Sequence, residues 1–406
     1  MEKIYRTAII GGGAAGLMSA VTLTHGENAF SGDDLIVIEK NDRVGKKLVA
    51  TGNGQGNLTN ANITAENYYG DKAFIENFIN QTKSELLREQ FDFLGIPLLE
   101  QKDGKIYPLS KQANSVLDII RSYLNYKGVK ESTQNKVNSI TKKGDLFLVN
   151  TLNGVIKAQS VILATGGAAA KQFGTDGSSY ALAENFGHKK TQIYPSLVQL
   201  KTDLEKIRGL KGLKETARVT AVVDGREVKS AVGDLLFTEF GVSGNAVFSV
   251  SAAVTDKKDA KLIVEFLPHL SQEKTQEILE NRNNSPFIGE QDLLTGVINK
   301  RIGQAVMKTV RDKTPKSVAT ALKNFTLSVT GNLGFNYAQV TKGGIVSKDI
   351  DTKTYQSKIV KDLYIVGEML DIDGDCGGYN LTFAFISGIV AANSIKSSLS
   401  KGNNNE

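Results

Sequence analysis

Apolar positions along the chain follow two patterns: short buried runs, and longer stretches with helical spacing. The run YRTAII at 5–10 predicts a buried β-strand, and it leads through GGGAAG at 11–16 into a helical stretch. LIVIEK at 35–40 predicts a second strand, so the chain opens with a β-α-β unit. Two later runs, SVILATGG at 160–167 and KDLYIVGE at 361–368, predict further buried strands that end in glycine.

The segments between these strands have regular patterns of their own. Apolar residues at helical spacing predict helices within 71–94, at 113–128 and at 175–188. Alternation of apolar and polar residues from 135 to 158 predicts a small antiparallel sheet. The last apolar stretch, 380–399, predicts a helix.

The middle of the chain changes character twice. It is strand-rich from 196 to 253, with a DG turn at 224–225, and it has helical spacing from 254 to 325. A strand pattern returns at 337–346. Because buried, glycine-ended strands lie on both sides of this middle part, we predict a discontinuous α/β nucleotide-binding domain. It would enclose an insertion with a β part and a helical part.

A glycine motif follows the first predicted strand directly. Gly11, Gly13 and Gly16 form G-x-G-x-x-G at the start of a helix. The first glycine allows a tight turn, the second lets a pyrophosphate approach the backbone, and the third lets helix and strand pack closely. Glu39 lies at the end of the second strand, where a carboxylate accepts hydrogen bonds from a ribose hydroxyl. The full arrangement predicts a dinucleotide site.

The kind of dinucleotide is narrowed by Glu39. A carboxylate here repels a 2′-phosphate, so NADP is a poor candidate, whereas NAD and FAD both satisfy the position. Parallel strands bring their carboxyl ends to one edge, and FAD is long enough to touch all three glycine-ended turns. Gly377 and Gly378 precede the last helix, whose N-terminal dipole would favour a reduced, anionic flavin.

The acidic residues just before that helix offer an alternative. Asp371, Asp373 and Asp375 have the spacing that begins an EF-hand calcium loop. The glutamate at the end of such a loop and its flanking helices are missing, so we expect no metal site.

Composition adds few constraints. The chain has 406 residues and one cysteine, Cys376, which excludes an intramolecular disulfide and fits a reducing cytoplasm. We predict no signal peptide and no membrane span, hence a cytoplasmic protein without a membrane partner. The net charge of +6 is interpreted as a mild excess with scattered lysines, which makes nucleic acid an unlikely partner.

Several motifs together give a specific resemblance. The whole chain resembles the bacterial family of FAD-dependent oxidoreductases that includes aminoacetone oxidase and a 3-dehydro-bile-acid reductase. The matching segments, in family order, are GGGAAGL (11–17), GKKLVATGNGQGNLTN (45–60), ATGG (164–167), GTDGSSYALAENFGH (174–188), GDLLFTEFGVSGNA (233–246), AQVTKGGI (338–345) and LYIVGEMLDIDGDCGGYNLTFAF (363–385).

This resemblance implies an α/β fold with three parts. A discontinuous Rossmann-like FAD-binding domain would take residues 1–195 and 340–401. A β-barrel-like insertion would take 196–253 and 326–339, and a helical insertion 254–325.

The resemblance also assigns a role to the uncharged, glycine-rich loop at 51–57. In the family this stretch reads T-G-(G/N)-G-R-C-N and lies against the flavin. The chain departs from the pattern at two positions, with Gln55 in place of the arginine and Gly56 in place of the cysteine. Lys46 and Lys47 lie nearby in sequence and could supply positive charge to a phosphate, or be ordinary solvated lysines.

Cofactor contacts can be carried over motif by motif. Val137 matches the place where such folds pass a backbone amide and carbonyl to adenine, although it also suits a plain strand position. The residues implied to bind FAD are Gly11, Gly13, Ala15, Gly16, Glu39, Lys40, Lys46, Thr51, Val137, Gly166, Gly367, Glu368, Asp371, Asn380 and Leu381.

No catalytic residue can be named from the sequence. The histidines 25, 188 and 269 form no local triad, and His188 is interpreted as structural. A flavin would carry out the redox step while the protein orients a small organic substrate. Two chemistries compete: an oxidase acting on an amine such as aminoacetone with O2, or a reductase that uses NAD(P)H to saturate an activated C=C bond.

Two interpretations outside this class stay open. One is a flavin-binding RNA-modification protein, which would need a clustered basic face. The other is a nucleotide-binding protein without turnover. The absence of a second G-x-G-x-x-G after a later strand argues against a dedicated NAD(P)H domain, although transient NAD(P)H binding is allowed. The oligomeric state is not predicted.

Overall fold

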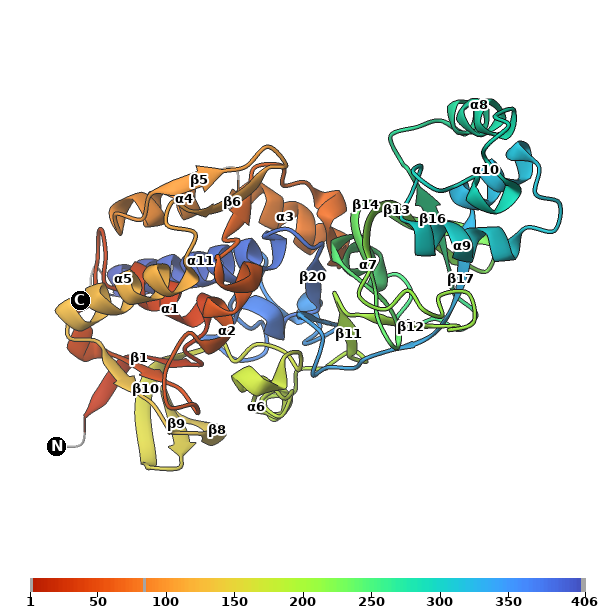
Figure 1. Ribbon diagram of the computed structural model, residues 1–406. Helices are drawn as coiled ribbons and strands as arrows, with labels where there is room; N and C mark the ends of the chain where they lie inside the picture. The colour runs from red at the N-terminus through yellow and green to blue at the C-terminus, as the bar shows by residue number, and fades with distance from the viewer. Residues whose placement is uncertain (1–2, 83–84, 403–406) are drawn as a thin grey trace. The chain divides into compact units, whose positions relative to one another are not determined.

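The computed structural model describes residues 3–82 and 85–402 (Figure 1). The chain forms two compact units. The discontinuous unit consists of Met1–Ile193 and Val340–Glu406, and the inserted unit consists of Tyr194–Gln339. Both names are kept below.

The discontinuous unit is built on a seven-stranded sheet of order β7-β2-β1-β10-β9-β8, with β19 also paired to β10. Pairings among β7, β2, β1, β10 and β19 are parallel, whereas β8 and β9 run antiparallel. Its strands are β1 (Ile4–Ile10), β2 (Leu35–Ile38), β7 (Lys130–Ser132), β8 (Val137–Lys143), β9 (Leu146–Thr151), β10 (Gly154–Leu163) and β19 (Leu363–Ile365).

Helices α1, α5 and α11 lie along one side of this sheet (Figure 1). Every residue of α1 from Ala15 to Leu23 is buried, which is typical of a helix that is apolar all round. The close crossing of α11 requires Gly388, whose Cβ would collide with the carbonyl of Ala15. The helices of this unit are α1 (Ala14–Leu23), α2 (Lys46–Val49), α3 (Lys72–Thr82), α4 (Leu86–Phe93), α5 (Ala113–Tyr126), α6 (Tyr180–Glu184) and α11 (Tyr379–Gly402).

Short strands complete the discontinuous unit. β3 pairs with β6 and β6 with β5, while β20 pairs with β4. Their bounds are β3 (Thr59–Asn60), β4 (Tyr68–Gly70), β5 (Leu98–Glu100), β6 (Lys105–Pro108), β18 (Val340–Lys342) and β20 (Ile372–Gly374).

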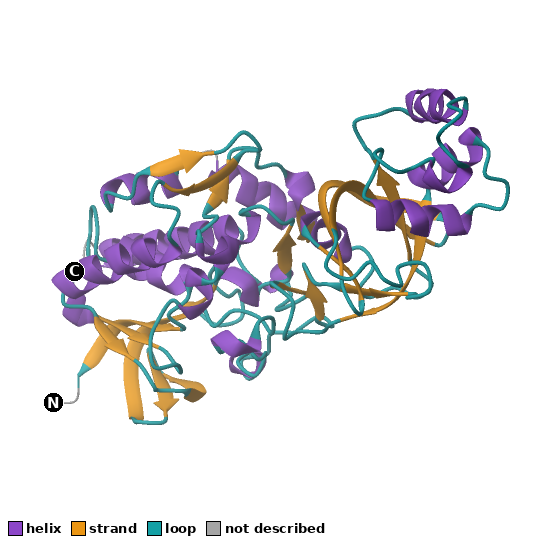
Figure 2. Ribbon diagram, in the orientation of Figure 1, coloured by secondary structure: helices purple, strands orange, loops and turns teal. Residues whose placement is uncertain are grey.

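The inserted unit contains a closed barrel of order β12-β15-β14-β13-β16-β17. Its β13–β14 hairpin turns at Asp224 and Gly225, both at positive φ, as the DG pair predicts. Helices α8, α9 and α10 gather at one end of the barrel strands (Figure 2). The elements are β11 (Tyr194–Ser196), β12 (Leu200–Thr202), β13 (Lys214–Val223), β14 (Arg226–Phe237), β15 (Gly241–Ser243), α7 (Asn245–Ser251), β16 (Lys261–Phe266), α8 (Gln272–Asn283), α9 (Lys300–Thr309), α10 (Pro315–Lys323) and β17 (Phe325–Asn332).

The parallel sheet with its helices and the separate barrel confirm the predicted fold class. Three local predictions were wrong. The helix expected at 175–188 is only the short α6, the strand pattern at 245–251 is α7, and 254–325 contains a barrel strand, β16. Among the described residues, no helix is long and apolar enough to cross a membrane.

Candidate cofactor site

The glycine turn between β1 and α1 has the geometry of an anion site. At Gly11, φ is +103° and a Cβ would lie 2.5 Å from the carbonyl oxygen of Ala164, so only glycine fits. At Gly13, no described atom lies within 4 Å of the Cβ position, which leaves this side of the turn open. Gly13 caps α1 without a side-chain hydrogen bond, and the first turn of α1 has no acidic residue. Its free N–H groups can therefore receive a phosphate.

Glu39 is held firmly at the end of β2. The side chain is 8% exposed, and its two carboxylate oxygens accept hydrogen bonds from the backbone N–H groups of Gly12 (2.9 Å) and Asn41 (2.8 Å). Each carboxylate oxygen keeps further acceptor capacity. The position beside the glycine turn matches the ribose role expected for Glu39.

The carboxyl ends of β1, β10 and β19 meet beside this turn. β10 pairs with β1 on one edge, and its last residues pair with β19 on the other. Gly367, two residues after the end of β19, has φ +65°, and a Cβ there would lie 3.1 Å from the Cβ of Ala15 on α1. Its N–H donates to the hydroxyl of Ser387 on α11. The carboxyl ends of the three glycine-ended strands thus lie along one edge of the sheet, as predicted.

A polar cluster ties four segments together next to Gly367. Glu368 accepts a hydrogen bond from the N–H of Thr341 (2.9 Å) and pairs with the ammonium group of Lys47 (2.6 Å). The hydroxyl oxygen of Thr341 accepts from the N–H groups of Ala168 and Ala169. A side chain at Gly167 would collide with this cluster. We call Lys47, Glu368, Thr341 and their two backbone donors the Glu368 cluster.

The glycine-rich loop 51–57 is fixed in place and leads into a segment bound to the start of α11. Thr51 donates its hydroxyl proton to the carbonyl of Leu48. The hydroxyls of Thr59 and Thr382 lie 2.7 Å apart, and Asn60 donates to the carbonyl of Gly377 (2.9 Å). The segment therefore lies against the helix start that the sequence analysis placed at the flavin.

Asn380 orders the loop in front of α11. Its side chain accepts from the N–H of Gly374 and donates to the carbonyl of the same residue, both at 2.8 Å. Leu381 follows it in the first turn and is partly buried. The acidic stretch from 371 to 375 contains strand β20 rather than a calcium-type loop, and among residues 3–82 and 85–402 no group of acidic, His or Cys side chains has metal-binding geometry.

Two predicted lysine contacts are engaged elsewhere. Lys40 pairs with Asp176 at 3.3 Å, and Lys46 pairs with Asp42 at 2.5 Å. Burial raises the pKa of Asp176, but hydrogen bonds from Ser178 and the charge of Lys40 bring it down to about 2. The charge of both lysines is therefore already partly neutralised by an aspartate before any phosphate binds.

Asp371 and Val137 lie at different parts of the unit. Burial raises the pKa of the Asp371 carboxyl, although a hydrogen bond with Thr191 opposes this. Val137 begins β8, two residues after Asn135, whose N–H donates to the carbonyl of Glu39. Val137, the residue expected at the adenine, is thus close in sequence to Asn135, which is hydrogen-bonded to the backbone of Glu39.

Comparison with known proteins identifies the family. The family described as "HI0933-like protein Rossmann domain" matches residues 5–394. The chain belongs to this HI0933-like family. It is 32% identical over 404 residues to the 3-dehydro-bile acid delta(4,6)-reductase of Clostridium scindens, covering 95% of this chain and 98% of that protein.

Other relatives carry a different name. The ribosomal RNA dihydrouridine synthases of Haemophilus influenzae and Escherichia coli are 27% and 26% identical, covering 97% and 95% of this chain and 99% and 96% of theirs. Among solved structures, a 3-ketosteroid-delta4-(5alpha)-dehydrogenase from Rhodococcus jostii RHA1 is 14% identical, covers 98% of each chain and has a TM-score of 0.50. That likeness supports the fold. The family and the relative that is named a reductase confirm the prediction of an oxidoreductase.

The residues present fit an FAD molecule. The turn at Gly13 is open for a pyrophosphate, Glu39 can accept from a ribose, and three glycine-ended strands line one edge. The start of α11 offers backbone groups beside the segment that follows loop 51–57. The predicted site residues thus come from one compact unit.

The loop's geometry suits glycine rather than cysteine at position 56. Gly56 has φ +76°, and a Cβ there would lie 3.1 Å from the Cα of Ala113 on α5. A cysteine at this position would have to change the backbone or move α5. Gln55 is exposed, so an arginine would fit there without a collision.

Sequence reasoning missed part of the site. Thr341 and the pairing of Lys47 with Glu368 join segments about 170 and 320 residues apart, beyond the reach of local patterns. Their signal is the matching segment 338–345, to which the sequence alone assigns no role. His188, in contrast, is structural as interpreted: it is 3% exposed and its Nε2 bonds to the hydroxyl of Ser357 (2.8 Å).

Proposed function

We propose that this chain is a flavoenzyme that uses NAD(P)H to reduce a C=C bond conjugated to a carbonyl group. The observation that carries the proposal is the 32% identity to a 3-dehydro-bile acid delta(4,6)-reductase across nearly the whole of both chains. A 3-dehydro bile acid has a ketone at position 3, and its Δ4 and Δ6 bonds are conjugated with it. The reaction takes up a hydride and a proton and releases NAD(P)⁺.

The more distant relatives support the same bond chemistry. Dihydrouridine forms when two hydrogens add to the C5=C6 bond of uracil, which is conjugated to the C4 carbonyl. A uracil in RNA is therefore our second candidate substrate. It is favoured by the names of two relatives whose match to this chain covers 96% or more of their own length.

We assign FAD contacts by the positions described above. The glycine turn at 11–16 would bind the pyrophosphate, Glu39 the ribose, and Gly166, Gly367 and the Glu368 cluster the middle of the molecule. Thr51, Asn380 and Leu381 would lie at the flavin end, and Val137 at the adenine. Bound FAD supplies the hydride-transfer chemistry. Lys40, Lys46 and Asp371 would contribute charge at the margins of the site.

The inserted unit is the region we assign to substrate recognition, and NAD(P)H is expected as a transient co-substrate. The domain bounds 1–195 and 340–401, 196–253 and 326–339, and 254–325 stay our proposed division, as does a cytoplasmic location. Oxidation of an amine such as aminoacetone is the competing chemistry.

An anaerobic titration tests the proposal. NADH or NADPH is added to the purified FAD-loaded protein while the oxidised-flavin absorbance is followed. Rapid bleaching, followed by recovery of colour on adding a steroidal 4-en-3-one or a uridine oligonucleotide, supports a reductase of conjugated C=C bonds. Bleaching by aminoacetone but not by NAD(P)H, with recovery only in air, would replace it with an amine oxidase.

A further inference from the structure

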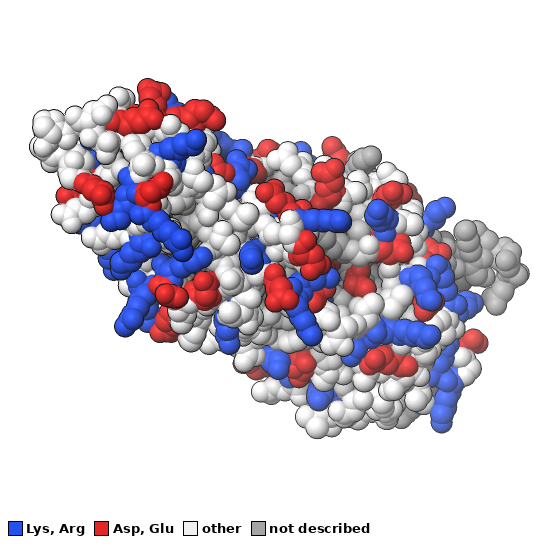
Figure 3. All heavy atoms as spheres, turned by 90° about the vertical axis from the view of Figure 1, so that its right-hand side faces the viewer, with Lys and Arg blue, Asp and Glu red and all other residues white. Residues whose placement is uncertain are grey.

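One segment of the inserted unit carries a high positive charge. Residues 300–323 contain seven Lys and Arg and one acidic residue, Asp312. This net charge of +6 equals that of all 406 residues, so the rest of the chain is neutral overall. On the face shown in Figure 3, Lys and Arg side chains also gather in one dense group, while elsewhere they alternate with Asp and Glu.

The segment folds as α9, a short connection and α10, and much of its charge is uncompensated. Lys313 pairs with Glu290, and Lys323 is buried against Glu265. Four other cations are exposed, and their side chains form no hydrogen bond or ion pair with any residue that the structure describes. They are Lys300, Lys308, Arg311 and Lys316, and we call them the basic strip.

Two of these cations, Lys300 and Lys316, are placed unfavourably in the free protein, whereas Lys308 lies in the last turn of α9, where a cation is favoured. Lys300 lies in the first turn of α9 and Lys316 in the first turn of α10, and neither first turn contains an acidic residue. Helix N-termini carry partial positive charge, so a lysine there is repelled. A bound anion relieves this repulsion. Along α9, Lys300 and Lys308 are about 12 Å apart by the helical rise, which is longer than one small anion spans.

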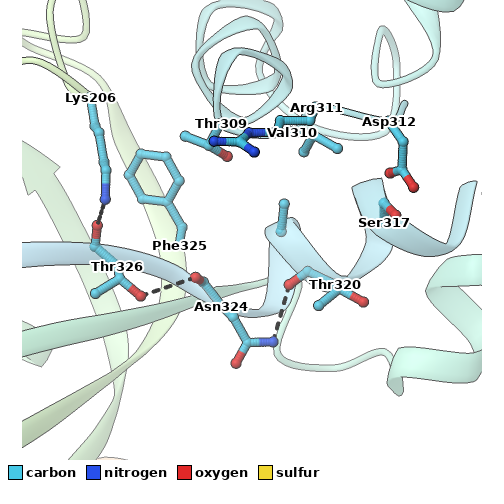
Figure 4. Close-up of a pocket in the computed structure, with 11 residues that line it drawn as sticks. Lys206, Thr309, Val310, Arg311, Asp312, Ser317, Thr320, Asn324, Phe325 and Thr326 are labelled. Carbon is cyan, nitrogen blue, oxygen red and sulfur yellow. Dashed lines mark hydrogen bonds between the residues drawn. The ribbon is translucent and has the colours of Figure 1, made fainter. Parts of the chain in front are cut away.

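A hollow of about 520 Å³, lined by apolar as well as polar side chains, opens beside the strip (Figure 4). Arg311 lies at its edge near Thr309, and Ser317 and Thr320 of α10 form another wall. Lys206 is occupied by the carbonyl of Thr326 at 2.7 Å, which leaves Arg311 as the cation available to a ligand. The hollow thus presents hydroxyls, the free guanidinium of Arg311 and the carboxylate of Asp312. The hydroxyls and the guanidinium are groups that can bond a sugar and its phosphate.

We propose that the basic strip binds the phosphate backbone of an RNA, with one nucleotide entering the hollow at Arg311. A line of unpaired cations matches a polymer with regularly repeated charges. Hydroxyl and amide groups in the hollow can bond a ribose, whose 2′-OH both donates and accepts. This inference deepens the second candidate function, reduction of a uracil in RNA, and it rests on that candidate for the chemistry. The binding of RNA by the strip does not depend on that candidate.

Fluorescence anisotropy with the full-length FAD-loaded protein and a labelled single-stranded uridine-rich RNA tests the strip. We expect affinity to fall steeply between about 50 mM and about 200 mM salt. The variant with Lys300→Gln, Lys308→Gln, Arg311→Gln and Lys316→Gln should bind at least about tenfold more weakly. Its salt slope should decrease by about 0.7 for each phosphate that the variant no longer neutralises.

The matched control removes four exposed lysines from the discontinuous unit: Lys102→Gln, Lys130→Gln, Lys143→Gln and Lys353→Gln. An equal loss of affinity in both variants, or no RNA binding by the wild type at low salt, overturns the proposal. Equal affinity for heparin also overturns it, because a general polyanion surface would then explain the strip. Flavin bleaching by NAD(P)H is measured on the same samples. RNA binding with no bleaching would reject the reductase and keep the strip, and the reverse result would do the opposite.

Discussion

The cofactor site and the basic strip use positive charge in opposite ways. In the discontinuous unit, the lysines around the cofactor site are paired: Lys40 with Asp176, Lys46 with Asp42 and Lys47 with Glu368. In the inserted unit, the four cations of the basic strip have no partner among the described residues.

The contrast teaches how each site meets its ligand. The proposed cofactor site offers backbone N–H groups, glycines and a carboxylate held by two hydrogen bonds, so we expect binding there to depend on geometry. The strip offers flexible, solvated charge, which gives salt-dependent binding with little geometric demand. We therefore expect cofactor binding to respond to the addition of single atoms at the glycines, and binding at the strip to respond to the loss of net charge.

The largest expected effect comes from Gly11→Ala. Its Cβ would lie 2.5 Å from the carbonyl oxygen of Ala164 at a φ of +103°. Strain of this kind costs about 1–3 kcal/mol, and displacement of the turn adds to it, so we expect FAD affinity to fall roughly 100-fold. The ratio of FAD to protein after purification measures it. Gly209→Ala is the control, since φ is +86° there but no described atom lies within 4 Å; a colourless Gly209→Ala protein would contradict the local explanation.

A smaller effect is expected from restoring the family residues in loop 51–57. Gly56→Cys places a side chain at φ +76° and 3.1 Å from the Cα of Ala113, so the free energy of unfolding should decrease by about 1–2 kcal/mol. Gln55→Arg is exposed and should change it by less than about 0.5 kcal/mol. Urea titrations of both variants give these values. Equal stability of the two would show that the loop adapts more freely than its contacts indicate.

The ion pairs of the two units can be compared directly. Lys47 and Glu368 are 25% and 18% exposed, whereas Lys211 and Glu239 of the inserted unit are 68% and 54% exposed. Double-mutant cycles to alanine should give a coupling of about 1–2 kcal/mol for the first pair and below about 0.5 kcal/mol for the second. Similar couplings would remove burial as the reason for the difference between the units.

The smallest effect concerns acid. Burial lowers the pKa of His188 below its ordinary value of 6.5. Below pH 6.5 the unfolded chain takes up this proton more readily than the folded chain does. Stability is therefore complete above pH 6.5 and decreases as pH falls through the folded-state pKa. His188→Gln, which can still bond to Ser357, should flatten the dependence of unfolding free energy on pH between about 6.5 and about 5. An unchanged slope would assign the acid sensitivity to another group, such as His25, whose pKa burial also lowers.

The nucleotide-binding half of the fold could be predicted because its signals are local. Three of its buried strands lead into glycine turns, and the motif at 11–16 combines turn, helix start and close packing in six residues. Two of the wrong predictions lie where a helical spacing of apolar residues was taken for the alternation of a strand, or the reverse. In α7 the buried residues are 246, 247, 250 and 251, a helical spacing within a stretch rich in valine. In β16, Leu262, Val264 and Phe266 alternate as a strand should, but helical segments surround them.

The site residues, too, could be predicted only where a local motif contains them. Glu39 and the glycines follow from a motif, whereas the Glu368 cluster exists only because α2, β18 and the turns after β10 and β19 meet in space. No short-range pattern encodes such a meeting. The basic strip was visible in the sequence, since seven cations lie within 24 residues, but counting charge over the whole chain hid it.

Strand β10 has a consequence for how the chain is made. Its first half pairs with β9, which is already present, but its second half pairs with β19, about 200 residues later. A ribosome therefore releases the whole inserted barrel before it releases the strand and the helix, α11, that cover β10 and α1. The barrel has all its strands between 200 and 332 and can fold as it emerges. Until α11 has been synthesised, the apolar surface of α1 that packs against α11 stays uncovered. Vectorial synthesis thus makes the inserted unit the first to mature and the cofactor-binding unit the last.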